Sequence, residues 1–129
     1  MKVQSVLLVL AATLALSMAA VGFRRQVKDE FLKDSELLQK IVDIEKYKDI
    51  IMFNYEALST KPNLNAKEEQ LIQESDELEQ MLFEDYRAYE NMLKSNELTP
   101  TEIFSFAKTS IEERYPLIKR LSAKFSDNS

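Results

Sequence analysis

Carboxylates are the side chains of this 129-residue chain that could do chemistry, because the sequence contains no histidine and no cysteine. The usual general base, thiol nucleophile and transition-metal ligands are therefore missing. The acids gather in two places, and their positions are Glu74, Asp76, Glu77, Glu79, Glu84 and Asp85. A di-iron bundle needs Glu-x-x-His and an EF-hand needs a glycine-bearing loop, and the sequence has neither pattern. Lysine with serine or tyrosine could form a rarer catalytic set, but no spacing singles one out. We therefore expect a solvated acidic helix face on which any Ca²⁺ or Mg²⁺ contact is weak and incidental, with no enzymatic activity, no dedicated metal site and no cofactor.

The elements that carry these acids should be helices. Gly22 is the only glycine, and tight hairpin turns and left-handed caps depend on glycine because it tolerates positive φ. Apolar residues recur at three- and four-residue steps in blocks at about 28–58 and 66–94. Residues 33–35 offer a break between a short entry helix and a longer one. The sequence predicts an all-α, elongated antiparallel bundle of three or four helices, two of them long and amphipathic, with connectors at 59–65 and 95–99.

The third helical block has a clear start and an expected interruption. The motif Leu-Thr-Pro-Thr-Glu-Ile at 98–103 is a capping box, with Thr99 as the N-cap and proline at the first helical position. Pro116 should kink or break this helix, since an interior proline costs about 3 kcal/mol. We expect a short last helix over 117–125 and a frayed tail at 126–129.

The N-terminus has the order of a secretory signal peptide. Lys2 precedes an apolar run at 6–16, and small residues follow. Cleavage after Ala19 or after Gly22 fits this pattern. The competing interpretation is a signal anchor, because residues 3–23 are largely apolar and are followed by two arginines.

Removal of residues 1–22 takes away one lysine and leaves 16 basic and 22 acidic residues, a net charge of −6. An acidic product without a basic cluster does not suit phosphate backbones, so we expect no nucleic-acid binding. With no cysteine, a secreted product must be stabilised by packing alone. Residues 23–125 are long enough to bury one core, and we expect a single helical domain.

The sequence around the two connectors forms an internal repeat, in which the second unit follows the first at an offset of 34 residues. An aromatic residue, a polar connector, a leucine and a capping box occur in both units: Tyr55, Leu64, Asn65 and Glu68, then Tyr89, Leu98, Thr99 and Glu102. The alternative is that any two helix-turn-helix junctions look alike. A tetratricopeptide repeat has the same period, but its Trp, Gly and Ala positions are missing here.

The two units resemble the SXP/RAL family of secreted nematode proteins over roughly Met52 to Phe125. The resemblance rests on Tyr55, Leu58, Leu64, Asn65 and Glu68, then on Tyr89, Met92, Leu98, Thr99 and Glu102. A tryptophan often found in the first unit of that family is absent. The resemblance implies a small, antigen-like extracellular helical protein with no established enzymatic activity.

Three apolar runs, 50–53, 81–83 and 104–106, place large side chains on more than one helical face. Such helices need cover from other helices, a partner or a lipid. Ordinary core packing is the simplest interpretation. The candidate interface residues are Phe53, Phe83 and Phe106, for a protein partner or self-association. The alternatives are an extracellular lipid carrier and, if the leader is retained, a membrane-tethered scaffold.

Overall fold

The computed structural model describes residues 23–95 and 97–128, which form four α-helices and contain no strand. The helices are α2 (Phe23–Lys33), α3 (Ser35–Ser59), α4 (Ala66–Lys94) and α5 (Pro100–Asn128). The predicted all-α class is confirmed for this part of the chain. The predicted signal peptide, with its cleavage sites at Ala19 and Gly22, lies outside the described residues.

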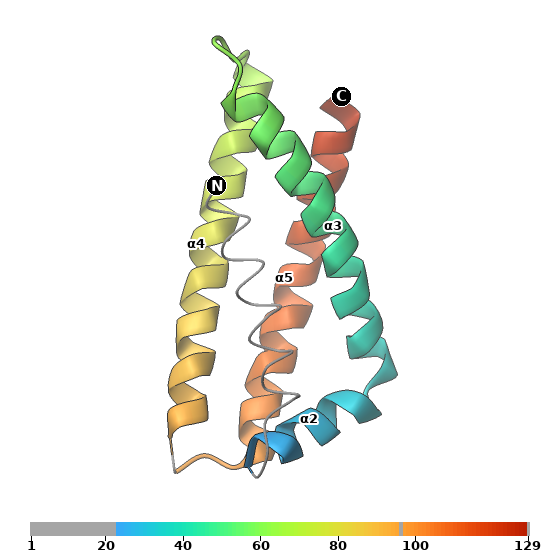
Figure 1. The fold of residues 1–129 in the computed structure, drawn as a ribbon, viewed down its shortest axis with the longest axis vertical. Helices are drawn as coiled ribbons and strands as arrows, with labels where there is room; N and C mark the ends of the chain where they lie inside the picture. Colours follow the sequence, from blue (N-terminus) through green and yellow to red (C-terminus); the bar gives the residue numbers. More distant parts are fainter. Residues whose placement is uncertain (1–22, 96, 129) are drawn as a thin grey trace.

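The long helices run in alternating directions, so that α4 is antiparallel to its neighbours and α3 is parallel to α5 (Figure 1). Helix α5 packs against α2, α3 and α4. Helices α3 and α4 approach each other at the end where residues 60–65 join them, and they diverge toward the other end (Figure 1). At that diverging end, α2 packs against α3 and α5. Helices α4 and α5 have 29 residues each, which corresponds to a length of about 43 Å. The bundle is elongated, as the sequence predicts.

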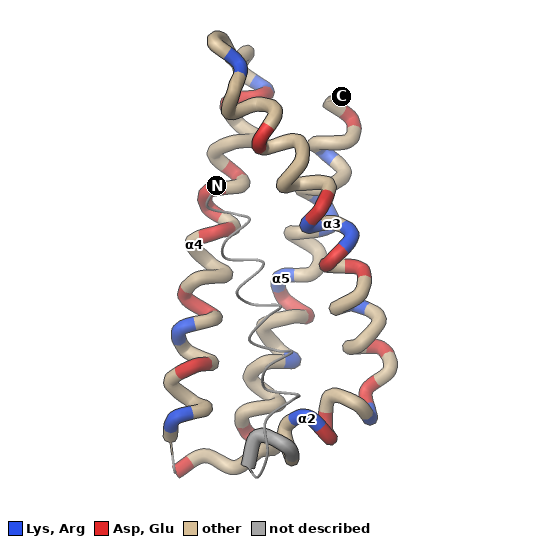
Figure 2. Tube along the Cα trace, viewed as in Figure 1, with Lys and Arg blue, Asp and Glu red and all other residues tan. Residues whose placement is uncertain are grey.

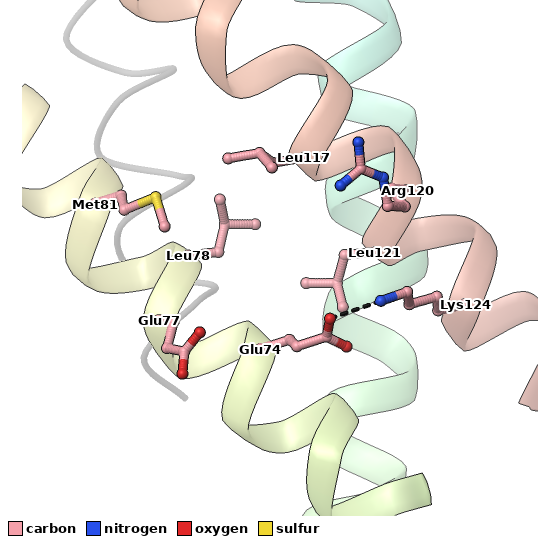
Figure 3. A pocket seen from close by; sticks show the side chains of 8 residues that line it. All are labelled: Glu74, Glu77, Leu78, Met81, Leu117, Arg120, Leu121 and Lys124. Atoms are coloured by element: carbon pink, nitrogen blue, oxygen red, sulfur yellow. Dashed lines mark hydrogen bonds and ion pairs between the residues drawn. The ribbon is translucent and has the colours of Figure 1, made fainter.

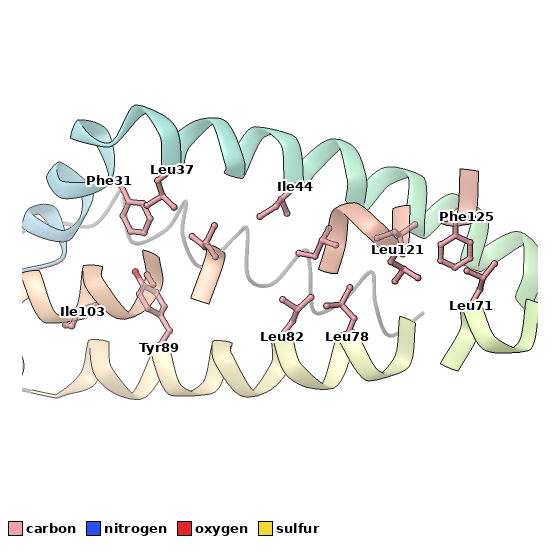
Figure 4. Close-up of a cluster of buried hydrophobic side chains, with 14 of the residues drawn as sticks. Phe31, Leu37, Ile44, Leu71, Leu78, Leu82, Tyr89, Ile103, Leu121 and Phe125 are labelled. Carbon is pink, nitrogen blue, oxygen red and sulfur yellow. The ribbon is translucent and has the colours of Figure 1, made fainter. Parts of the chain in front are cut away.

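One hydrophobic core runs along the inside of the bundle (Figure 4). Its α3 members, Leu37, Ile44, Ile51 and Leu58, recur at every seventh residue. A seven-residue interval keeps side chains on the same side of a helix, so this row remains against its neighbours over the whole of α3. The core members from the other helices are Val27, Phe31, Leu71, Leu78, Leu82, Tyr89, Ile103, Ala107, Ile111, Ile118, Leu121 and Phe125.

Side chains cap three of the helix starts. The carboxylate of Asp34, the residue between α2 and α3, accepts a bond of 3.0 Å from the amide three residues on, so the division expected at 33–35 is present. Asn65 and Glu68 form a reciprocal capping box, with bonds of 2.8 and 3.1 Å between side chain and backbone. Thr99 and Glu102 form the second box, with both bonds at 3.2 Å. The two units of the repeat therefore share the same capping geometry.

The expectation of a break at Pro116 and a separate last helix is wrong, because α5 is one helix from Pro100 to Asn128. Pro116 and Glu112 are both exposed. The carbonyl of Glu112, which loses its helical donor to the proline, can therefore bind water. Buried Ile111 and Ile118 hold the turns on either side of the proline in the core. Residues 126–128, expected to fray, also lie in this helix.

Replacement of Pro116 by alanine should stabilise the protein. Alanine restores the amide donor to the carbonyl of Glu112, and the loss of the proline's restriction on the unfolded chain offsets only part of the gain, so we expect a net increase of about 2 kcal/mol. Urea unfolding followed by circular dichroism measures this change. Thr109→Ala, another exposed position on α5, should change stability by less than about 0.5 kcal/mol. A destabilised Pro116→Ala variant would mean that the core requires the local geometry that the proline imposes.

Candidate functional site

The structure places the three candidate aromatic residues in different surroundings. Phe53 on α3 is 75% exposed, and Phe83 on α4 is 42% exposed. The guanidinium carbon of Arg87 lies 5.6 Å from the centre of the Phe83 ring, which is cation–π geometry. Phe106 on α5 is partly buried and packs against the core. The surface candidates are therefore Phe53 and Phe83, while Phe106 contributes to packing.

The apolar run at 50–53 divides between the core and the surface. Ile51 is fully buried, and Ile50 packs partly against the core. Because successive residues of a helix are about 100° apart, Phe53 points away from the side that Ile51 occupies. The sequence run thus supplies core residues and one large aromatic side chain that the described chain leaves in solvent.

Phe53 belongs to a row of exposed side chains that we call the outer stripe of α3. Its members recur at three- and four-residue steps and are all exposed: Gln39, Val42, Lys46, Asp49, Phe53 and Glu56. Val42, at 49% exposure, is the second apolar member. The stripe lies opposite the buried row that begins at Leu37, so it faces away from α5. Because it holds the more exposed of the two surface candidates, it is the stronger candidate interface in the described part of the chain.

The acidic residues of α4 are only partly the solvated face that the sequence indicates. Asp76, Glu77 and Glu84 are exposed, and Figure 2 shows acidic residues along most of α4. Half-buried Glu74, however, accepts a bond of 2.6 Å from the ammonium group of Lys124 on α5. In the described part of the chain, no group of three or more potential ligand residues is placed to hold a metal ion.

Asp85 forms the most enclosed ion pair between helices. Its side chain is 14% exposed, and that of its partner Arg114 is 25% exposed. The guanidinium donates two bonds, of 2.8 and 3.2 Å, one to each carboxylate oxygen. Ser110 donates a third bond, of 2.8 Å, to the same carboxylate. This forked arrangement orients both side chains and joins α4 to α5.

The shifted pKa values move titratable groups away from neutrality. The hydrogen bond from Lys108 is the main reason that the pKa of Asp34 is lowered, and the same contact raises the pKa of Lys108. Burial, followed by the hydrogen bond to Asp76, raises the pKa of Tyr55 to about 12. The pKa of Arg114 is raised mainly by its bond to a carboxylate. A general acid or base for work near pH 7 needs shifts in the opposite direction.

A pocket of about 110 Å³ lies between α4 and α5 (Figure 3). Leu78, Met81, Leu117 and Leu121 give it an apolar lining, and the ion pair of Glu74 with Lys124 crosses one end. Small-molecule sites usually have volumes of about 300 Å³ or more, so this pocket does not favour a bound lipid.

A larger depression, of about 390 Å³, lies where α2 meets α3. Five of its six lining residues are charged or polar, and the set is Glu30, Lys33, Asp34, Ser35, Glu36 and Phe104. An acyl chain would leave these groups without water, at a considerable cost. This depression also does not favour the lipid-carrier interpretation.

Comparisons of the chain with protein-family models, with curated proteins and with solved structures found no match. The resemblance to the SXP/RAL family therefore stays a prediction. None of the helices in the described part of the chain has an apolar stretch that could cross a bilayer.

Acid should weaken the fold in a defined pH range. The carboxyls whose pKa values are lowered are Asp34, Asp43, Glu68 and Glu90. A carboxyl with a lower pKa in the folded state contributes stability above its ordinary value, near pH 4, and loses that contribution as the pH falls through the folded value. We expect the urea midpoint to change little between pH 7 and 5 and to decrease between about pH 4 and 2.

Asp34→Asn is the matched variant for this test. Asparagine retains an oxygen for the N-cap bond but gives Lys108 no negative partner. At pH 7, the urea midpoint of the variant should be lower than that of the unaltered protein. Between pH 7 and 2, the midpoint of the variant should decrease by less. Equal losses in the two proteins would contradict a role for this carboxylate in the acid response.

Proposed function

We propose that this chain is a small secreted helical protein that acts by protein–protein interaction, with a different protein or with itself, and has no catalytic activity. The observation that carries the proposal is the 75% exposure of Phe53 on the outer stripe of α3. Burying a phenylalanine side chain stabilises by about 1.5–3 kcal/mol, and the described helices do not realise this gain. A partner that covers the outer stripe would.

The composition of the outer stripe fits a contact surface. Large aromatic side chains contribute strongly to the centres of protein interfaces, where surrounding groups exclude water. Val42 lies on the same side of α3 as Phe53, and the exposed charges of Lys46 and Asp49 lie between them. This arrangement combines apolar contact with charges that orient a partner.

The absence of catalysis is supported by the chemistry of the available groups. The sequence has no histidine or cysteine, and the shifted carboxyl pKa values are lowered. These acids are held in caps, ion pairs and hydrogen bonds from neighbouring side chains, and they remain charged at neutral pH. Their role in the proposal is structural.

Secretion rests on the N-terminal sequence pattern. The antigen-like character rests on the resemblance to the SXP/RAL family. A membrane-tethered scaffold remains the alternative if the leader is retained. The lipid-carrier alternative has less support, because the pocket between α4 and α5 is small and the depression at α2 and α3 is lined by charge.

Secretion predicts that the protein is recovered from culture medium with a new N-terminus. N-terminal sequencing should begin at Ala20 or at Phe23, because small residues precede both positions. Recovery only from detergent-solubilised membranes, with the leader intact, would contradict secretion and favour the tethered form.

Photo-crosslinking at position 53 tests protein binding. A benzophenone amino acid in place of Phe53 resembles the native aromatic side chain, and its exposure predicts little effect on folding. In extracts and secretions of the source organism, we expect protein adducts that unlabelled protein suppresses by competition.

The matched control carries the same probe at Leu32 on α2, an apolar side chain that is 51% exposed. We expect this position to give few adducts and none that competition suppresses. The same adduct pattern at both positions, or no adduct at position 53, would overturn the proposed binding role of the outer stripe.

A further inference from the structure

We propose that the partner of the outer stripe is a second copy of this chain, with the two α3 helices antiparallel about a two-fold axis. This inference rests on the proposed function, because it assigns a partner to the same surface. It adds a symmetry, a register and a set of contacts that the sequence and the structure specify.

The chemistry of the stripe is symmetric about its own centre. Val42 and Phe53 lie at equal distances from the point between residues 47 and 48, and so do Lys46 and Asp49. In an antiparallel pair centred there, Val42 faces the partner's Phe53, and Lys46 faces the partner's Asp49. A two-fold axis repeats each contact, so the two chains bury two apolar pairs and form two ion pairs.

The outer members of the stripe obey the same symmetry. Gln39 and Glu56 are also centred between residues 47 and 48, so Gln39 faces the partner's Glu56. The Gln39 amide donates one hydrogen to Asp43 at 3.0 Å within its own helix, and its second hydrogen can be donated to the partner's carboxylate. Every pair of facing positions from 39 to 56 is therefore complementary in this arrangement.

The charges select this orientation over a parallel one. Parallel helices in register would place Lys46 beside the partner's Lys46 and Asp49 beside the partner's Asp49. Like charges on directly facing positions repel each other. Within residues 26–95 and 97–128, neither Lys46 nor Asp49 has an ion-pair partner. Both charges are available to a second copy.

The position of α3 leaves room for this pairing. Helix α3 forms one edge of the bundle, with α5 and α4 on its other side (Figure 1), and charges of both signs follow its length (Figure 2). A stable interface usually buries about 800 Å² per partner. A single helical stripe covers less than this, so we expect a weak dimer that forms with increasing concentration.

Charge exchange tests the register. By sedimentation equilibrium from about 10 μM to 1 mM, protein secreted by an expression host should dimerise, and Lys46→Glu or Asp49→Lys should each weaken dimerisation by about tenfold because each pair occurs twice. The double variant re-forms both pairs with reversed sign and should recover dimerisation. Lys119→Glu on α5 makes the same change in net charge as Lys46→Glu and should have little effect, because it lies outside the stripe.

Disulfide trapping provides a second test, because the chain has no cysteine of its own. A mixture of Val42→Cys and Phe53→Cys proteins should form crosslinked dimers under mild oxidation. Either variant alone should not, since identical positions would lie about 16 Å apart along the paired helices, beyond the reach of a disulfide. Equal crosslinking in the single-variant samples would overturn the antiparallel register.

The outcomes separate the two proposals. A protein that stays monomeric to 1 mM while the probe at position 53 captures another protein would overturn self-pairing and leave the proposed function in place. A monomer without adducts at position 53 would overturn both. A dimer that neither charge variant weakens would overturn the assignment to the outer stripe.

Discussion

The packing of α2, α3 and α4 onto α5 is the constraint on which the rest of the structure depends. The chain has no cysteine to form a crosslink, so burial of apolar side chains must outweigh the conformational entropy lost on folding. Helices α3 and α4 approach each other only near their connector (Figure 1). Their hairpin acquires a continuous core because Ile103, Ile111, Ile118 and Phe125 run along α5 and are almost fully buried.

Polar contacts then fix the register of the helices, that is, their relative position along their axes. Between α5 and the start of α3, Lys108 binds Asp34 at 2.7 Å and Tyr115 binds Asp43 at 3.0 Å, across 74 and 72 residues of sequence. When two parallel helices pack in a single register, the residues that contact each other all have nearly the same separation in sequence. Partly exposed contacts of this kind add little net stability, but a shift by one helical turn would separate both of them. Their contribution is to specify one alignment from among several that would bury similar apolar area.

The parts of the fold that could be predicted from sequence are those whose cause lies within a few residues. The capping boxes at Asn65 and Thr99 are local hydrogen bonds, and the residue types and spacing indicate them directly. At Asp34 the sequence indicates only a break between helices, and the structure adds the N-cap bond. An equally local rule predicts a kink or a break at Pro116, but α5 does not break there, because the freed carbonyl lies at an exposed residue and the flanking turns pack into the core. At this position, tertiary packing outweighs the low intrinsic helix propensity of proline.

The candidate site shows the same limit. Phe53 and Phe106 look alike in sequence, yet one lies in solvent and the other packs against the core, because the outcome depends on where the neighbouring helices lie. Lys40 looks like a solubilising charge, but its ammonium group lies 3.7 Å from the carboxylate of Glu112 and 5.9 Å from the centre of the Tyr115 ring. Contacts between residues so far apart in the chain leave no pattern in a short window of a single sequence.

The outer stripe also shows how a helix can present apolar side chains without forming a continuous apolar surface. A row made only of apolar side chains would pair in many registers and would invite aggregation. Placing Lys46 and Asp49 between Val42 and Phe53 interrupts the apolar surface. It also makes most registers unfavourable, because they bring an apolar group against a charge or like charges together. In the proposed pairing, the same two charged residues limit the affinity of this face and also determine which surface can cover it.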